Sequence, residues 1–141
     1  MKNPKIEIKL VNNWSKDEIV NLYKAGGWWR ESYSSAGIKP LISGSFGFAV
    51  IIDKKSGKAI GMGRIISDGV SDAYIQDLVI LPEYRGLGYG KKLVDFLIKY
   101  CLSKGLLWIG LIAEPDQDGF YTNLGFKHMT NYKPMKYQRE E

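Results

Sequence analysis

The sequence predicts an α/β (α+β) fold in which a mixed, mostly antiparallel central sheet is flanked by helices. Two observations favour this fold. A strand-like hairpin lies within residues 46–67, and a strand, a helix and a further strand follow it within residues 72–113. A hairpin gives antiparallel strands and a helical crossover gives parallel ones, so the sheet should be mixed. The length of 141 residues is that of one domain, which we place over residues 1–141.

The first 40 residues are expected to form a strand and a helix. Residues 6–11 alternate between apolar and charged side chains, which is typical of a strand. Ser15 and Glu18 have the spacing of a capping box, in which the serine accepts from the third helical amide and the glutamate reaches back. The Gly-Gly pair at 26–27 should end this helix, and residues 28–40 should form a loop or a broken second helix.

The middle of the chain supplies the hairpin and the next strand. Residues 46–53 and 58–67 are strand-like on either side of the turn sequence KKSG, so they should pair as a hairpin. Residues 72–81 are largely apolar, and this strand should therefore be central in the sheet.

The remaining elements follow from apolar spacing and from glycine. Apolar side chains recur at helical spacing from Leu93 to Cys101, which indicates an amphipathic helix. A buried strand is expected at 106–113, a short helix before Gly125, and one or two last strands within 126–137.

Composition and charge limit the classes of protein. No apolar run is long enough to span a bilayer, and the N-terminus lacks the apolar centre of a signal peptide, so we expect a cytoplasmic protein. The single cysteine, Cys101, excludes an internal disulfide and gives no metal-site spacing, so no metal is expected. The net charge of +5 favours an anionic partner such as a phosphorylated cofactor, a nucleic acid or an acidic surface.

A cluster of glycines stands between the strand at 72–81 and the helix that follows. Gly86, Gly88 and Gly90 fall where the first amides of a helix are unpaired and carry partial positive charge. Glycine lets an anion approach such amides without a Cβ in the way, and Arg85 adds a formal charge. The cluster predicts a pyrophosphate cradle, although a simple turn and helix cap would also use glycine.

Two common phosphate-binding motifs do not match the cluster. A P-loop would need glycine at Arg85 and a hydroxyl side chain at Lys92, and a dinucleotide fingerprint would need glycine at Lys91. A third pattern, Arg or Gln followed by x-x-Gly-x-Gly or Ala, is satisfied by Arg85, Gly88 and Gly90.

The stretch VILPEYRGLGYG, residues 79–90, resembles the acetyl-CoA signature of the Gcn5-related N-acetyltransferase (GNAT) superfamily. A second stretch, GFYTNLGF at residues 119–126, resembles an element that this family carries near its C-terminus. The resemblance covers residues 73–126. The sequence AEPDQDG at 113–119 departs from it, because many members have there an asparagine that helps to hold the cofactor.

The resemblance implies an enzyme that transfers an acetyl group directly from acetyl-CoA, its cosubstrate, to a primary amine, which we expect to belong to a small molecule. It also implies that the strand at 78–80 splays from the strand at 106–112 to admit the pantetheine arm, and that an amide near Leu78 or Val79 stabilises the oxyanion. The implied cofactor-binding residues are Leu78, Val79, Ile80, Arg85, Gly86, Leu87, Gly88, Tyr89, Gly90 and Lys91.

Two residues are candidate catalysts. Asp77 lies beside the expected thioester position and is the candidate general base, and the other interpretation is a solvated or paired strand carboxylate. Tyr121 matches the tyrosine of the second family element, which makes it the candidate acid that protonates the leaving thiolate. Its other interpretation is a core aromatic residue.

Trp28, Trp29 and Tyr74 are the candidate acceptor-binding residues. In this family the first helix and the loop after it often line the acceptor site, and an aromatic wall there would suit an arylalkylamine or a cation. The other interpretation is that one tryptophan fills the core and its neighbour packs under the loop.

The runner-up function is a non-catalytic CoA-binding sensor or interaction module. Nucleic-acid binding is disfavoured because Lys and Arg are spread along the chain without a recognised binding motif. We therefore expect acetyl-CoA and an amine acceptor as partners, no nucleic acid and no membrane, and a monomer or a homodimer.

Overall fold

The computed structural model describes residues 4–139, which form two compact units that divide between Leu111 and Ile112. The first unit contains the sheet, and the second contains one short helix. The predicted mixed sheet with flanking helices is confirmed. The single domain over residues 1–141 stays a prediction.

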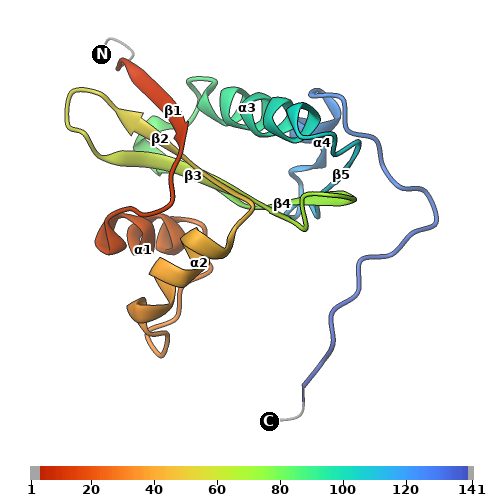
Figure 1. Ribbon diagram of the computed structural model, residues 1–141, viewed down its shortest axis with the longest axis horizontal. Helices are drawn as coiled ribbons and strands as arrows, with labels where there is room; N and C mark the ends of the chain where they lie inside the picture. The colour runs from red at the N-terminus through yellow and green to blue at the C-terminus, as the bar shows by residue number, and fades with distance from the viewer. Residues whose placement is uncertain (1–3, 140–141) are drawn as a thin grey trace. The chain divides into compact units, whose positions relative to one another are not determined.

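The sheet of the first unit has five strands in sequence order (Figure 1). Three pairs of neighbours are antiparallel, and the last two strands pair in parallel, as the hairpin and the helical crossover predict. The strands are β1 (Ile6–Leu10), β2 (Gly47–Asp53), β3 (Ala59–Ser67), β4 (Asp72–Ile80) and β5 (Trp108–Gly110).

Helices cover both faces of this sheet (Figure 1). One face carries α1 (Lys16–Ala25) and α2 (Ile38–Gly44), which bury a cluster with β2 and β3 side chains such as Phe48 and Met62. The opposite face carries α3 (Tyr89–Ser103). Short 3₁₀ turns precede α2 at Ser35–Gly37 and α3 at Pro82–Tyr84. The broken second helix expected within residues 28–40 therefore forms as a 3₁₀ turn that leads into α2.

The predicted capping box at the start of α1 forms only in part. The Ser15 hydroxyl accepts from the Glu18 amide at 3.3 Å, as predicted. The Glu18 carboxylate does not reach back. It instead accepts from the Trp14 indole at 2.9 Å and from the Ala59 amide of β3 at 2.7 Å. Glu18 therefore ties α1 to the sheet, a partner that local sequence cannot show.

The predicted buried strand at 106–113 is wrong in length and in burial. Leu106 is fully buried, but Leu107 is 81% exposed and Trp108 is 40% exposed. The strand is short because β5 pairs with β4 over only three residue pairs, from Asp72–Trp108 to Tyr74–Gly110. Trp108 pairs within this ladder and its side chain is still partly exposed, so backbone pairing alone does not bury the apolar side chains of this segment.

The second unit holds α4 (Asp118–Thr122), and Gly125 follows it with φ +100°. The prediction of one or two strands within 126–137 is wrong, because residues 126–139 form no strand in the described structure. A strand needs a neighbour to pair with its backbone groups, and no pairing involves this segment in the part of the chain described. Within residues 4–139, no helix combines the length and apolar character needed to cross a membrane.

Candidate active site

The glycine cluster forms an open turn between β4 and α3. Gly86 and Gly88 have φ values of +79° and +84°, in the left-handed region that favours glycine. A Cβ built on either residue would meet no atom within 4 Å. The turn therefore has free space in front of its backbone, where a side chain at either position would stand.

The start of α3 points its first amides into this turn. Gly88 is the N-cap, and the first intrahelical bond runs from the Lys92 amide to the Gly88 carbonyl at 3.2 Å. The amides before Lys92 have no helical partner and carry the positive end of the helix dipole. Open space beside such amides fits a pyrophosphate, so these residues suit the cosubstrate that the sequence predicts.

Arg85 has a structural use in addition to its charge. Its Nε donates to the Ile80 carbonyl at 2.8 Å, and its Nη2 donates to the Ala25 carbonyl at 3.4 Å. The side chain thus ties the glycine turn to the end of β4 and to the end of α1. Its formal charge remains beside the turn.

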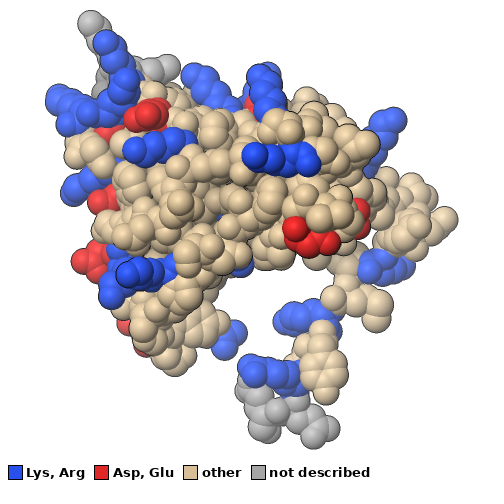
Figure 2. Space-filling view, in the orientation of Figure 1, with Lys and Arg blue, Asp and Glu red and all other residues tan. Residues whose placement is uncertain are grey.

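A lysine-lined pocket of about 380 Å³ adjoins the same turn. Leu87 and Tyr89 join it to the glycine cluster, and three lysines line it, namely Lys5, Lys54 and Lys92. Figure 2 shows Lys and Arg side chains gathered at the upper left, over the start of β1. This end of the first unit is therefore suited to an anionic ligand.

Among the described strand pairs, the β4 edge that faces β5 has no partner along its second half, and we call this stretch the open edge. Pairing with β5 stops at Tyr74, whereas β4 continues to Ile80. The Leu81 amide donates to the Ile60 carbonyl of the β3 side, and backbone groups alternate along a strand, so the backbone groups of Leu78 and Ile80 face the open edge. The Ile80 carbonyl already accepts from Arg85 Nε, which leaves the Ile80 amide for an added chain. An extended chain could add to β4 there through backbone hydrogen bonds.

A β-bulge interrupts β4 next to this open edge. Arg64 pairs with Gln76 and Met62 pairs with Val79, so Asp77 and Leu78 together stand opposite Gly63. Asp77 has φ +58°, a left-handed conformation that is uncommon for any residue with a side chain.

Three side chains from three elements meet at this bulge. The Asp77 Oδ2 accepts from Arg64 Nε of β3 at 2.6 Å and from the Tyr23 hydroxyl of α1 at 2.8 Å. Burial and the neighbouring carboxylate raise the pKa of Tyr23 above its ordinary value, so its hydroxyl stays protonated and donates. Sequence reasoning identified neither Tyr23 nor Arg64. The signal that could have identified Arg64 is its charge within the otherwise apolar strand sequence AIGMGRIIS.

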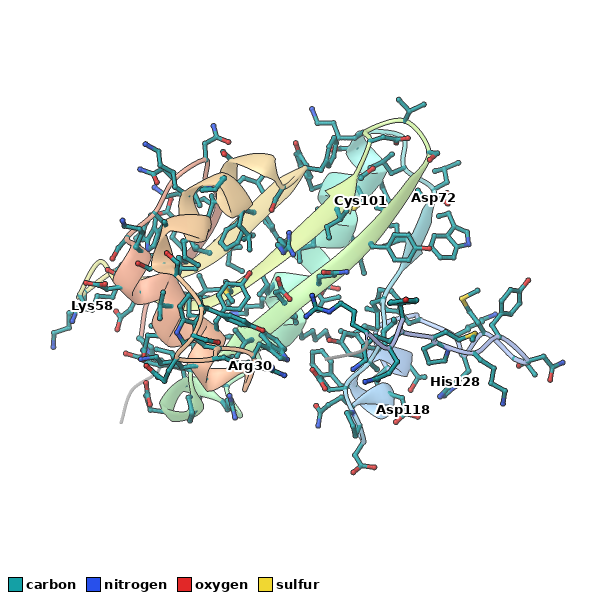
Figure 3. The ribbon with its side chains drawn as sticks, turned by 90° about the horizontal axis from the view of Figure 1, so that it is seen from below. Arg30, Lys58, Asp72, Cys101, Asp118 and His128 are labelled. Atoms are coloured by element: carbon teal, nitrogen blue, oxygen red, sulfur yellow. The ribbon has the colours of Figure 1, made fainter. Side chains whose placement is uncertain are left out.

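Trp28 and Trp29 lie after the C-terminal end of α1, and both are half-buried against the core cluster. The Trp28 ring meets the Tyr23 ring edge-on, with 6.2 Å between the ring centroids. The Trp28 ring also packs on Gly26, where an added Cβ would stand 2.5 Å from Trp28 Cε3. Trp29 contacts Tyr33 edge-on at 5.5 Å. The loop that both tryptophans begin continues with the exposed Arg30 (Figure 3).

The Tyr74 side chain is exposed on the face of the sheet that carries α1 and α2, outside the area that these two helices cover. Its ring contacts Trp108 at 5.4 Å, and Ile66 is its cross-strand partner on β3. The three side chains are each 40–45% exposed. Trp108 was not predicted as a site residue, because the sequence LLWIGLIA is typical of a buried strand.

Cys101 is buried in the first unit, and His128 is exposed in the second. Cys101 is buried on the side of α3 that faces the sheet, and burial raises the pKa of its thiol (Figure 3). In the second unit the exposed His128 Nε2 lies 2.9 Å from Asp118 Oδ2, and this pairing lowers the pKa of Asp118 (Figure 3).

Tyr121 lies on α4 of the second unit among other aromatic rings. Its ring meets Phe120 at 5.0 Å and Phe126 at 5.8 Å, both edge-on. Burial and the nearby Glu114 carboxylate raise the pKa of its hydroxyl. The phenol therefore stays protonated across the neutral range, as a proton donor requires.

Comparison with known proteins gives a family match over most of the chain. The acetyltransferase (GNAT) family model matches residues 13–126. An uncharacterized N-acetyltransferase of Pyropia yezoensis is 34% identical over 130 residues, which are 86% of this chain and 73% of that protein. A chloroplastic serotonin N-acetyltransferase 2 of Oryza sativa is 38% identical over 71 residues, which are 50% of this chain and 36% of that protein.

Solved structures show the same fold. A GNAT-family acetyltransferase of Streptococcus pneumoniae superposes with a TM-score of 0.79 at 26% identity and covers 97% of this chain and all of that one. Glucosamine-6-phosphate N-acetyltransferase of Arabidopsis thaliana superposes with a TM-score of 0.74 at 18% identity and covers 95% of this chain and 99% of that one.

Proposed function

The chain belongs to the acetyltransferase (GNAT) family and is an N-acetyltransferase, and from this we propose that it transfers acetyl groups from acetyl-CoA to the primary amine of an aromatic small molecule. The open glycine turn at the start of α3 is the observation that carries the proposal. It offers unpaired amides, left-handed glycines and free space beside an arginine.

The cosubstrate would lie along the turn and the open edge of β4. The pyrophosphate would accept hydrogen bonds from the amides of residues 86–91, and Lys91 would add charge. The lysines of the adjoining pocket would favour the remaining phosphate. The pantetheine arm would pair with the backbone of residues 78–80, where β4 has no β5 partner among the described pairs.

Amides beside the bulge supply the stabilisation that acyl transfer needs. When the amine attacks the thioester, the carbonyl oxygen becomes an oxyanion. One hydrogen-bond donor oriented toward that oxygen stabilises the transition state by about 3 kcal/mol. The intermediate then collapses by expelling the CoA thiolate. We propose that Tyr121 protonates this thiolate, a role supported by its match to the tyrosine of the second family element. Its raised pKa keeps the phenol protonated at neutral pH.

The attacking amine must be neutral, so a group must take up its proton. The ion pair with Arg64 and the hydrogen bond from Tyr23 occupy the Oδ2 of Asp77, the residue predicted as the base. These partners fit the other interpretation, a paired strand carboxylate. We therefore propose that water carries the amine proton away from the site.

Aromatic side chains on the α1 face of the sheet favour an aromatic acceptor. Trp28 and Trp29 follow α1, while Tyr74 and Trp108 form an exposed pair on β4 and β5. The Oryza sativa relative, a serotonin N-acetyltransferase that the match covers over 36% of its length, agrees with an arylalkylamine acceptor.

A panel of amines tests the proposal. Acetyl-CoA should release its thiol with tryptamine and 2-phenylethylamine, less well with spermidine, and at background rate without amine. Acetyl-CoA binding should be measured by calorimetry in parallel. Tight binding without turnover of any amine would instead support the runner-up function, a CoA-binding sensor or interaction module.

A further inference from the structure

The backbone of Asp77 adopts a left-handed conformation, and the contacts of its side chain can stabilise it. A residue with a Cβ rarely takes a positive φ, and Asp77 has φ +58° in the middle of a strand. The conformation coincides with the bulge, where Asp77 and Leu78 together face Gly63. Aspartate tolerates this conformation better than most residues with a side chain, and contacts outside the strand can stabilise it further.

The partners of the Asp77 carboxylate come from two other elements. Arg64 Nε on β3 and the Tyr23 hydroxyl on α1 converge on one oxygen, Oδ2, at 2.6 and 2.8 Å. Tyr23 is 7% exposed, and the side chains of Arg64 and Asp77 are 18% and 22% exposed. A charge-assisted pair that is mostly shielded from water is stronger than a surface pair, so it can hold the carboxylate in place.

The opposite face of the sheet is shaped to receive the residue after Asp77. A Cβ on Gly63 would stand 3.1 Å from both Leu78 Cδ1 and Leu97 Cδ1. Glycine at 63 therefore leaves room for Leu78 to pack toward α3 while Asp77 turns toward α1. The bulge is fixed from both faces of the sheet.

We propose that Tyr23 and Arg64 are positioning residues, which hold Asp77 in its left-handed conformation and thereby orient the amides of Leu78 and Ile80 along the open edge of β4. In this role Asp77 does not remove the amine proton. Its carboxylate acts as the anchor through which α1 and β3 set the direction of the backbone. The inference rests on the proposed function, because those amides are the ones that would face the thioester.

Glycine at position 77 separates positioning from proton transfer. Asp77→Gly adopts a positive φ without cost, whereas Asp77→Ala does not. We expect Asp77→Ala to lower kcat about tenfold or more and Asp77→Gly to stay within about threefold of wild type. A general base would be lost equally in both variants, so an equal fall overturns the inference, and so does wild-type kcat in Asp77→Ala. The matched controls are Asp72→Ala and Asp72→Gly at the exposed start of β4, which should leave kcat unchanged.

A double-mutant cycle tests whether Arg64 acts through Asp77. Arg64→Met should lower kcat about fivefold or more in the wild-type background, and by less than about twofold in the Asp77→Gly background. Tyr23→Phe should follow the same pattern with a smaller effect. Losses that simply multiply in the double variants would overturn the inference, because each residue would then act independently of Asp77.

A binding measurement keeps this inference separate from the proposed reaction. Saturating acetyl-CoA should shift the ¹⁵N-amide resonances of residues 78–80 in wild type and in Asp77→Gly, but not in Asp77→Ala. If the wild type binds acetyl-CoA and acetylates no amine, the proposed function fails while this comparison still decides the inference. Equal shifts in all three proteins, or no shift in the wild type, would overturn it.

Discussion

Tyr121 is the residue on which the proposed proton donation depends. Burial and Glu114 raise its pKa, so the phenol keeps its proton to above pH 10, the ordinary range for tyrosine. Tyr121→Phe removes the hydroxyl and keeps the ring contacts with Phe120 and Phe126. We expect kcat to fall about 100-fold, within the range for a general acid, and the acetyl-CoA Kd to change less than about threefold.

Steady-state kinetics and calorimetry check this prediction. The control is Tyr132→Phe, which removes an exposed hydroxyl in the same unit and should leave kcat unchanged. Wild-type kcat in a folded Tyr121→Phe protein would mean that water protonates the thiolate and that Tyr121 is a packing residue.

Tyr23 gives a stability test that is independent of catalysis. Its folded pKa is raised by burial and by Asp77, so the unfolded chain loses this proton at lower pH than the folded protein does. The resulting stability is complete below about pH 10 and falls as the pH rises above that value. Urea unfolding at pH 9 and pH 11 should therefore show a smaller loss of unfolding free energy in Tyr23→Phe than in wild type. The control Tyr33→Phe changes an exposed tyrosine and should match the wild-type loss; an equal loss in all three proteins would contradict the assignment.

Helix α3 carries two equivalent glycines at its two ends, which makes a matched experiment possible. Gly88 and Gly105 have φ +84° and +79°, and neither has an atom within 4 Å of a built Cβ. Valine at either position strains the backbone to a similar degree. Only Gly88→Val should weaken acetyl-CoA binding, by at least about tenfold or 1.4 kcal/mol, because only that side chain stands before the helix amides.

Calorimetric titration of both variants with acetyl-CoA decides this point. Gly105→Val should bind as wild type does. Equal affinities for the two variants would show that the glycine turn is a helix cap without a ligand.

The loop after α1 is where acceptor choice should appear. Trp29→Ala should raise KM for tryptamine about tenfold while kcat changes little, because the ring would contact the acceptor in ground and transition states alike. Trp14→Ala removes a half-buried indole at the other end of α1 and should leave KM unchanged. Equal or better turnover of spermidine, with KM unaffected by Trp28→Ala and Trp29→Ala, would rule out an aromatic acceptor.

Local signals in the sequence located some elements and failed for others. The glycine turn, the hairpin and α3 could be predicted because glycine positions and apolar spacing act within a few residues. The length of the strand within 106–113 could not be predicted, because the apolar run is longer than the strand. The strand is limited by its pairing with β4, which ends at Tyr74. The Tyr23–Asp77–Arg64 contact joins residues 54 and 13 positions apart, and it depends on a bulge that shifts the register.

The first unit as a whole is organised around β4. Its start pairs with β5, its middle is bent by the bulge, and its end leads into the glycine turn. Backbone donors for the thioester arm and for the pyrophosphate would thus follow one another along a continuous segment. The chain's net charge of +5, and the lysine-lined pocket beside the turn, favour a polyanionic cosubstrate and disfavour a polycationic acceptor.

The most direct measurement follows a ¹³C-labelled acetyl group from acetyl-CoA to tryptamine by mass spectrometry, together with the amount of free CoA thiol. The account predicts one labelled N-acetyltryptamine for each thiol released, and no label transfer when the amine is omitted. Thiol release without a labelled amide would indicate thioester hydrolysis, and bound acetyl-CoA that stays intact with every amine would contradict the proposed acetyl transfer.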